Sequence, residues 1–178
     1  MKRTIGKLLL ILFALTLSLS ACGKKGADGA PTGYVAATDE QADFTFYVPQ
    51  KWTIDYSTAA AGAYYSASDP SSVSVMAWEL PNADTTLDDW WQINRGELES
   101  VFSNFTPESE ENTTVDGLYA KKYVYSASIG GYDYRFMQVA VIKGPSVYLF
   151  TYSSQPENFD SHLDEVNKML EFLSIGRS

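Results

Sequence analysis

Alternating apolar and polar positions begin at residue 43 and predict short strands in the first half of the folded region. Four such runs cover residues 43–49, 51–56, 62–68 and 73–80. Proline lies at or just beyond the end of the first, third and fourth runs, where its missing N–H interrupts strand pairing. We therefore expect four strands in this part of the chain.

The spacing changes to a helical period after residue 84. Residues 84–86 are suitable caps, and Asp88 and Asp89 would lie in the first turn, where the helix dipole favours carboxylates. At 100° per residue, one apolar arc contains Leu87, Trp91, Leu98, Phe102 and Phe105. Asn94 falls on the same arc and would need a hydrogen-bond partner if buried.

Two longer alternating runs, residues 118–129 and 132–143, predict a β-hairpin around Gly130-Gly131. A two-residue glycine loop suits a type I′ or II′ turn and sets the register of the two strands. The expected facing pairs are Ile129 with Tyr132 and Tyr125 with Phe136. The polar segment before the hairpin, residues 106–115, predicts a strand only near 112–115.

The chain closes with a strand over residues 147–152 and a helix that begins at Pro156, a favourable first helical position. Apolar side chains recur every three or four residues along this helix: Phe159, Leu163, Val166, Leu170 and Leu173. Together the patterns predict an α+β fold, with a mostly antiparallel sheet of about seven strands and two main helices.

The N-terminal part has a different pattern. Residues 8–19 are an uncharged apolar run of twelve residues that follows Lys2, Arg3 and Lys7. Such a run gives roughly 18 Å of helix, against ~30 Å for the hydrocarbon core of a bilayer. It is therefore too short for a stable span and is typical of a signal peptide, here over residues 1–21.

The end of this run carries the most specific motif. Leu19-Ser20-Ala21-Cys22 resembles the lipobox of bacterial lipoproteins. The resemblance implies a diacylglycerol thioether on Cys22, cleavage just before it, and often acylation of the new N-terminus, as with palmitate. Since two acyl chains anchor stably, it implies a lipid-anchored protein on the extracytoplasmic face of the cell membrane. The alternative is a free thiol at Cys22, the one cysteine of the chain.

Composition sets the limits of the folded part. Residues 22–42 are rich in glycine and alanine and predict a flexible tether behind the lipidated cysteine. Residues 43–178 are long enough for one domain with a core.

The net charge of the chain is negative. The chain has 13 lysines and arginines against 22 acidic residues, a formal net charge of −9. This balance argues against nucleic acid as a partner, because phosphate binding needs clustered basic side chains.

Several stretches of the domain resemble a known family. Residues 44–56 (FTFYVPQKWTIDY), 73–80 (VSVMAWEL) and 147–175, which begin VYLFTYSSQPENF, are similar to the PsbP-like domain. The resemblance implies the α/β/α sandwich shared by PsbP, the Mog-type Ran-binding protein and the lipoprotein DcrB. These relatives mostly bind other proteins, and the resemblance provides no catalytic residue to transfer.

The sequence shows no motif typical of a catalytic, metal or cofactor site. His162, the single histidine, falls at the edge of the last helix's apolar stripe, so we expect it to be solvated or half-covered. Glu108, Glu110 and Glu111 are expected to be solvated charges on a loop, since they lack a calcium-loop pattern. No nucleophile-elbow or phosphate-loop motif is present, and no cofactor is expected.

One aromatic patch is a candidate for partner binding. Trp90 and Trp91 are adjacent on the first helix, so they point about 100° apart and only one should be deeply buried. We expect Ile93 and one of the two tryptophans to be partly exposed; the alternative is burial of all three residues.

The function expected from the sequence is a non-enzymatic binding or accessory module of the cell envelope, attached to the membrane through Cys22. Its partner is an envelope protein or ligand that the sequence does not identify. Two alternatives stay open: an exported hydrolase or cell-wall enzyme with an unrecognised site, and a carrier of a small ligand.

Overall fold

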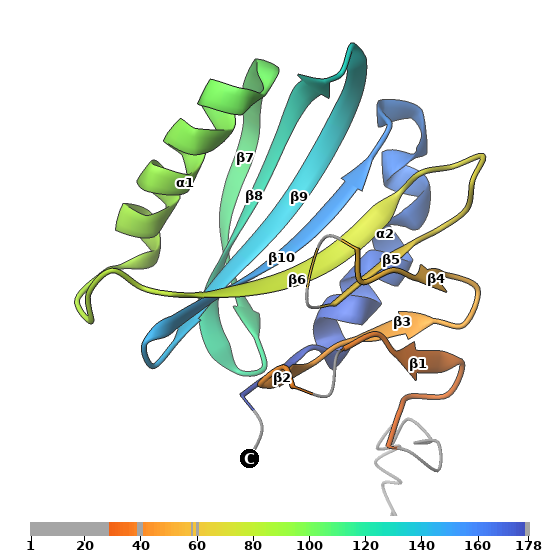
Figure 1. Cartoon of the computed structure of the whole chain (residues 1–178), viewed down its shortest axis with the longest axis horizontal. Helices are drawn as coiled ribbons and strands as arrows, with labels where there is room; N and C mark the ends of the chain where they lie inside the picture. Colours follow the sequence, from red (N-terminus) through yellow and green to blue (C-terminus); the bar gives the residue numbers. More distant parts are fainter. Residues whose placement is uncertain (1–28, 39–40, 58, 60, 177–178) are drawn as a thin grey trace, which may run out of the picture.

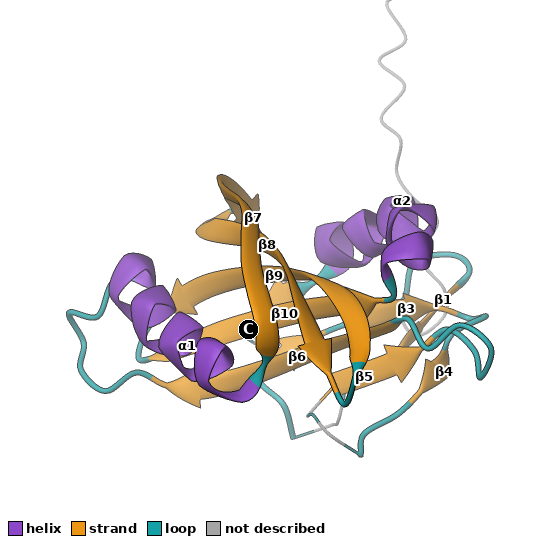
Figure 2. Ribbon diagram, turned by 90° about the horizontal axis from the view of Figure 1, so that it is seen from above, coloured by secondary structure: helices purple, strands orange, loops and turns teal. Residues whose placement is uncertain are grey.

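A seven-stranded antiparallel sheet forms the centre of the molecule in the computed structural model, which describes residues 29–38, 41–57, 59 and 61–176. Its strand order is β4-β5-β6-β10-β9-β8-β7. Helices α1 and α2 lie on opposite faces of this sheet (Figure 2). The α+β prediction of about seven strands and two main helices is therefore confirmed.

The bounds of the elements are close to those predicted for most of the domain (Figure 1). The strands of the large sheet are β4 (Thr53–Ile54), β5 (Ala61–Tyr64), β6 (Ser72–Glu79), β7 (Ser103–Val115), β8 (Leu118–Ile129), β9 (Tyr132–Lys143) and β10 (Ser146–Ser154). The helices are α1 (Leu87–Val101) and α2 (Pro156–Phe172). Two small ladders pair β1 (Tyr34–Ala36) with β3 (Tyr47–Pro49) and β2 (Phe44–Thr45) with β11 (Ser174–Ile175).

The predicted β8–β9 hairpin has the expected register. Ile129 faces Tyr132 and Tyr125 faces Phe136. Gly130 and Gly131 have φ angles of 60° and 87°, which side chains other than glycine adopt rarely. Helix α1 begins as predicted, because Thr86 and Asp89 form a reciprocal capping box.

The tether predicted for residues 22–42 is wrong for its second half. Tyr34 packs edge-on against Phe172 with ring centroids 5.0 Å apart, and Ala37 is fully buried. Strand β1 is therefore part of the domain, whose described part begins before residue 43. The glycine-rich composition hid a short run of Tyr34, Val35 and Ala37 that is apolar enough to pair and pack. Cys22 and the predicted signal peptide lie outside the described residues.

Strand β7 is much longer than the four residues predicted. Its thirteen residues are mostly exposed, so no alternating apolar pattern marks them in the sequence. The strand is held by its backbone ladder to β8, which breaks register between Ser103 and Thr106 and again between Pro107 and Ser109. Phe105 consequently belongs to β7, whereas the sequence placed it on the first helix.

The two faces of the sheet have different cores. Under α2 the core includes Phe46, Phe150 and Met169, all essentially inaccessible to solvent. Under α1, Trp91 stacks on Tyr123 with ring centroids 3.7 Å apart. In the described chain, the buried polar side-chain atoms without a hydrogen-bond partner are Asn94 Nδ2, Tyr123 Oη and Gln138 Oε1. Asn94 lies on the helical arc where burial calls for a hydrogen-bond partner, and among the described residues its buried amide nitrogen has none.

Helix α1 should open more readily than α2. It buries only Leu87 and Trp91, whereas α2 buries four side chains, and unpaired polar groups destabilise its interface by about 1 kcal/mol or more each. In native-state hydrogen exchange followed by mass spectrometry, we expect amides of α1 to exchange at least about tenfold faster than those of α2. Equal protection of the two helices would contradict this assignment.

Candidate functional site

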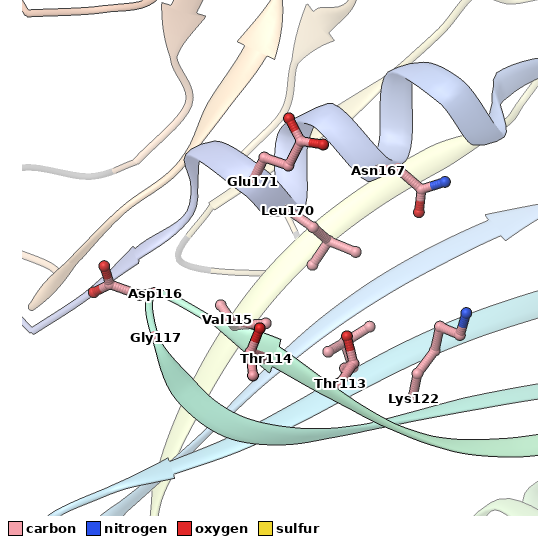
Figure 3. A pocket seen from close by; sticks show the side chains of 10 residues that line it. Thr113, Thr114, Val115, Asp116, Gly117, Lys122, Asn167, Leu170 and Glu171 are labelled. Carbon is pink, nitrogen blue, oxygen red and sulfur yellow. The ribbon is translucent and has the colours of Figure 1, made fainter. Parts of the chain in front are cut away.

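A groove runs between α2 and strands β7–β9. It consists of two adjoining cavities of about 500 Å³ and 400 Å³, and Lys122 and Asn167 line both. Figure 3 shows the larger cavity, with Asn167 and Leu170 of α2 pointing toward the strands and Thr113 and Lys122 on the opposite side. The groove thus brings together residues from the last helix and from the polar strand β7.

The groove exists because the helix and the sheet diverge. Helix α2 contacts β3, β9 and β10, and long strands twist in a right-handed sense. Strands β7 and β8 therefore turn toward the α2 side of the sheet and away from its plane, as seen from above in Figure 2. The space between the flank of α2 and this turned edge is left open.

The floor of the groove is apolar. Side chains of three strands and of one flank of α2 form it: Val115, Val124, Met137, Val139, Leu163 and Leu170. Leu163 and Leu170 are members of the predicted apolar stripe, but both are only half-buried. They form the margin of the core and leave apolar surface available to a ligand.

Ion pairs cross the groove at its α2 N-terminal end. Arg135 of β9 donates from Nε to Glu108 of β7 at 2.8 Å and from Nη1 to Asp160 of α2 at 3.0 Å. Its guanidinium lies 4.4 Å from the ring centroid of Phe159. Farther along, Lys122 Nζ lies 2.8 Å from Glu111 Oε2. Both basic groups of the groove are therefore already neutralised by carboxylates.

The three glutamates predicted as solvated loop charges lie on strand β7. Glu110 and Glu111 point to opposite faces, as neighbours on a strand do, and the register break between Pro107 and Ser109 puts Glu108 on the same face as Glu111. Glu108 and Glu111 pair with basic groups on the α2 face, whereas Glu110 accepts from Lys121 Nζ at 2.8 Å near α1. They remain exposed, but the loop assignment is wrong and they do not act as one cluster.

The aromatic patch predicted on the first helix has the expected accessibility. Ile93 is 58% exposed, Trp90 is half-buried and Trp91 is buried. The three residues lie on α1, on the opposite face of the sheet from the groove. Partner binding by this patch stays a prediction.

His162 is buried, contrary to the prediction. Its Nε2 lies 2.8 Å from Asp69 Oδ2, and its ring packs between Trp52 and Tyr65 with centroid distances of 5.6 Å and 4.4 Å. The segment before β6 folds over the edge of the α2 stripe, a long-range contact that helical periodicity does not report. His162, which we expected to be solvated or half-covered, therefore makes a buried structural hydrogen bond to Asp69.

This histidine does not form a catalytic arrangement with serine. Ser71 Oγ donates to Asp69 Oδ1 at 2.6 Å, so the carboxylate lies between the serine and His162. A nucleophilic triad needs the imidazole in the middle, as the base for the hydroxyl. Ser71 is also fully buried. Burial favours the neutral acid of Asp69, but hydrogen bonds from Ser71 and His162 hold its pKa below the ordinary value.

Across the residues that the structure describes, no group of three or more histidine, cysteine, aspartate and glutamate side chains is arranged to hold a metal ion. In the same part of the chain, neither helix is long and apolar enough to cross a membrane.

Comparison with known proteins shows which solved structures have a similar fold. No protein-family model and no curated protein matches the chain. Among solved structures, cyanobacterial PsbP from Synechocystis sp. PCC 6803 matches with a TM-score of 0.60 at 14% identity, over 86% of this chain and 98% of that chain. The chain has a PsbP-like fold.

Two bacterial proteins are similar to this PsbP-like fold at comparable levels. LpqN of Mycobacterium tuberculosis, described as involved in cell envelope biogenesis, gives a TM-score of 0.60 at 19% identity, over 81% of this chain and 91% of that chain. PA94 of Pseudomonas aeruginosa is of unknown function and is described as a putative regulator. It gives a TM-score of 0.54 at 14% identity, over 82% of this chain and 99% of that chain. At these identities the likeness concerns the fold alone.

Proposed function

We propose that this protein is a non-enzymatic binding module of the bacterial cell envelope, anchored through lipidated Cys22 at the extracytoplasmic face of the membrane. The observation that carries the binding role is the groove between α2 and strands β7–β9, with its apolar floor and charged rim. The lipobox-like sequence supports the anchor, and the involvement of LpqN in cell envelope biogenesis is in keeping with this location.

The chemistry of the groove favours binding over catalysis. Its Lys122 and Arg135 are held in ion pairs, which suits structural and recognition roles better than proton transfer. His162 lies buried elsewhere, against Trp52. Among the described residues that line the groove there is no histidine and no cysteine, the side chains that serine and cysteine hydrolases use as general base or nucleophile.

Site-specific crosslinking in intact cells tests this proposal. A photoreactive benzoylphenylalanine replaces Asn167, which is exposed in the groove, or Gln92, which is exposed on α1 at the opposite face. After illumination, membranes are solubilised and adducts are identified by mass spectrometry. We expect a discrete adduct from position 167 that position 92 does not give.

The adduct also separates the alternatives. A protein adduct at position 167 supports the binding module, and a small-molecule adduct there supports a ligand carrier instead. If positions 167 and 92 give the same adducts, or position 167 gives none, the groove is not the binding site and the proposal is wrong.

A further inference from the structure

The walls of the groove are acidic. On α2, Asp160, Asp164, Asn167 and Glu171 are all exposed and follow one another every three or four residues. Residues at this spacing lie on one face of a helix, so Asp164 shares the ridge that borders the groove. The opposite wall carries Glu108 and Glu111 on β7, and Asp116 lies at the far end. Six acidic side chains thus surround two basic ones.

The excess negative charge is offset only in part, by Lys168, which is exposed on α2 four residues after Asp164 and three before Glu171. Lys122 and Arg135 already pair with Glu111, Glu108 and Asp160. Asp164 and Glu171 form no ion pair with any other described residue. A ligand that enters the groove therefore meets two unpaired carboxylates along the α2 wall.

This charge selects among possible occupants. Phosphate groups, nucleic acid and anionic lipid headgroups would be repelled, since their own charges have the same sign. A second copy of this chain, with its formal net charge of −9, would be repelled too. A positively charged occupant is attracted, and the apolar floor adds the requirement for apolar side chains between its charges.

The dimensions indicate a short extended segment. Phe159 lines one end of the groove and Glu171 the other. Twelve helical steps between them span roughly 18 Å, which corresponds to about five or six residues of extended chain at ~3.3 Å each. Side chains of an extended segment alternate, so one set can contact the floor while the other reaches the rim.

We propose that the groove binds an extended segment of another protein in which lysine or arginine alternates with apolar residues. This inference rests on the proposed function, because it names the partner of the same groove. The aliphatic stems of lysine and arginine would lie along the apolar margin and their charged ends would reach the α2 carboxylates.

A binding measurement with defined peptides tests the charge requirement. The full lipidated protein, in a neutral detergent, is titrated into a labelled hexapeptide of alternating lysine and leucine; empty micelles provide the blank. Two analogues carry serine or glutamate in place of lysine. We expect the lysine peptide to bind at least about tenfold more tightly than the serine peptide, and the glutamate peptide not to bind. Raising the salt from 0.1 M to 1 M should weaken binding, because the Debye length falls from about 10 Å to about 3 Å.

Matched variants locate the site. D164N/E171Q removes the two unpaired carboxylates and should weaken the lysine peptide about fivefold. The control D84N/E97Q removes the same charge from exposed positions near and on α1 and should leave binding unchanged. T113W places a large side chain at the groove and should reduce binding about tenfold or more. Thermal unfolding by circular dichroism verifies that each variant is folded.

The outcomes distinguish this inference from the proposed function. Equal binding of the lysine and serine peptides, or equal affinity of D164N/E171Q and D84N/E97Q, overturns the charge inference. So does an adduct at position 167 that maps to an acidic or uncharged segment of a captured protein, although the groove would then still be a binding site. If position 167 crosslinks no differently from position 92, the proposed function itself fails, whatever the peptide result.

Discussion

Replacing His162 by alanine is expected to lower the free energy of unfolding by about 3 kcal/mol. The change removes a buried ring that packs against Trp52 and Tyr65, and it leaves Asp69 without one of its hydrogen bonds. Urea unfolding followed by tryptophan fluorescence measures the loss. The exposed residue Lys168 of the same helix provides a control, since Lys168→Ala should change stability by less than about 0.5 kcal/mol.

A loss below about 1 kcal/mol for His162→Ala would show that the buried contact matters little.

The hydrogen bonds of Asp69 also predict how stability depends on pH. Hydrogen bonds lower the pKa of Asp69 in the folded state, so its contribution is present above the unfolded-state pKa and is lost as the pH falls through the folded-state pKa. Stability curves below about pH 4 should therefore be shallower for Asp69→Asn than for the wild type.

Replacing Cys22 by alanine is expected to abolish lipid labelling of the protein. Cys22 is the single cysteine, so no other thiol can accept the diacylglycerol group. Cells grown with an alkyne analogue of palmitate, followed by gel analysis, report both the label and the size shift of the uncleaved precursor. With two acyl chains lost, stable anchoring by lipid is lost as well.

A position two residues before Cys22 provides the matched control for this experiment. Ser20→Ala keeps a small residue that the lipobox pattern accepts, so that variant should be labelled and cleaved like the wild type. Persistent labelling of Cys22→Ala would contradict the lipid anchor. Loss of label in both variants would indicate a processing defect unrelated to the sulfur of Cys22.

Local patterns predicted the parts of the fold that depend on neighbours in sequence. The Gly130-Gly131 loop set the hairpin register, and the Thr86 cap set the start of α1. Strand β7 could not be predicted at full length because its exposed polar side chains carry no period, and its backbone ladder to β8 leaves no pattern in the sequence. Tyr34 and Ala37 were missed because average composition conceals three or four apolar residues.

The candidate site was harder to predict than the fold. Lys122 and Asn167 line the same groove because the sheet twists toward α2, and neither belongs to a motif. One weak signal was available: Leu163 and Leu170 lie along one flank of the α2 stripe rather than at its centre. For His162 the helical pattern was misleading: it predicted an accessible side chain, but Asp69 from a distant segment packs against it and buries it.

The shape and charge of strand β7 affect how copies of this protein behave at high local concentration. It is an edge strand, and open edges of this kind can template fibrous self-assembly. Pro107, two breaks in register and three glutamates make the edge uneven and charged. Proteins tethered to one membrane meet far more often than proteins in dilute solution. If this chain is tethered as proposed, such an edge would let many copies crowd together without pairing through β7.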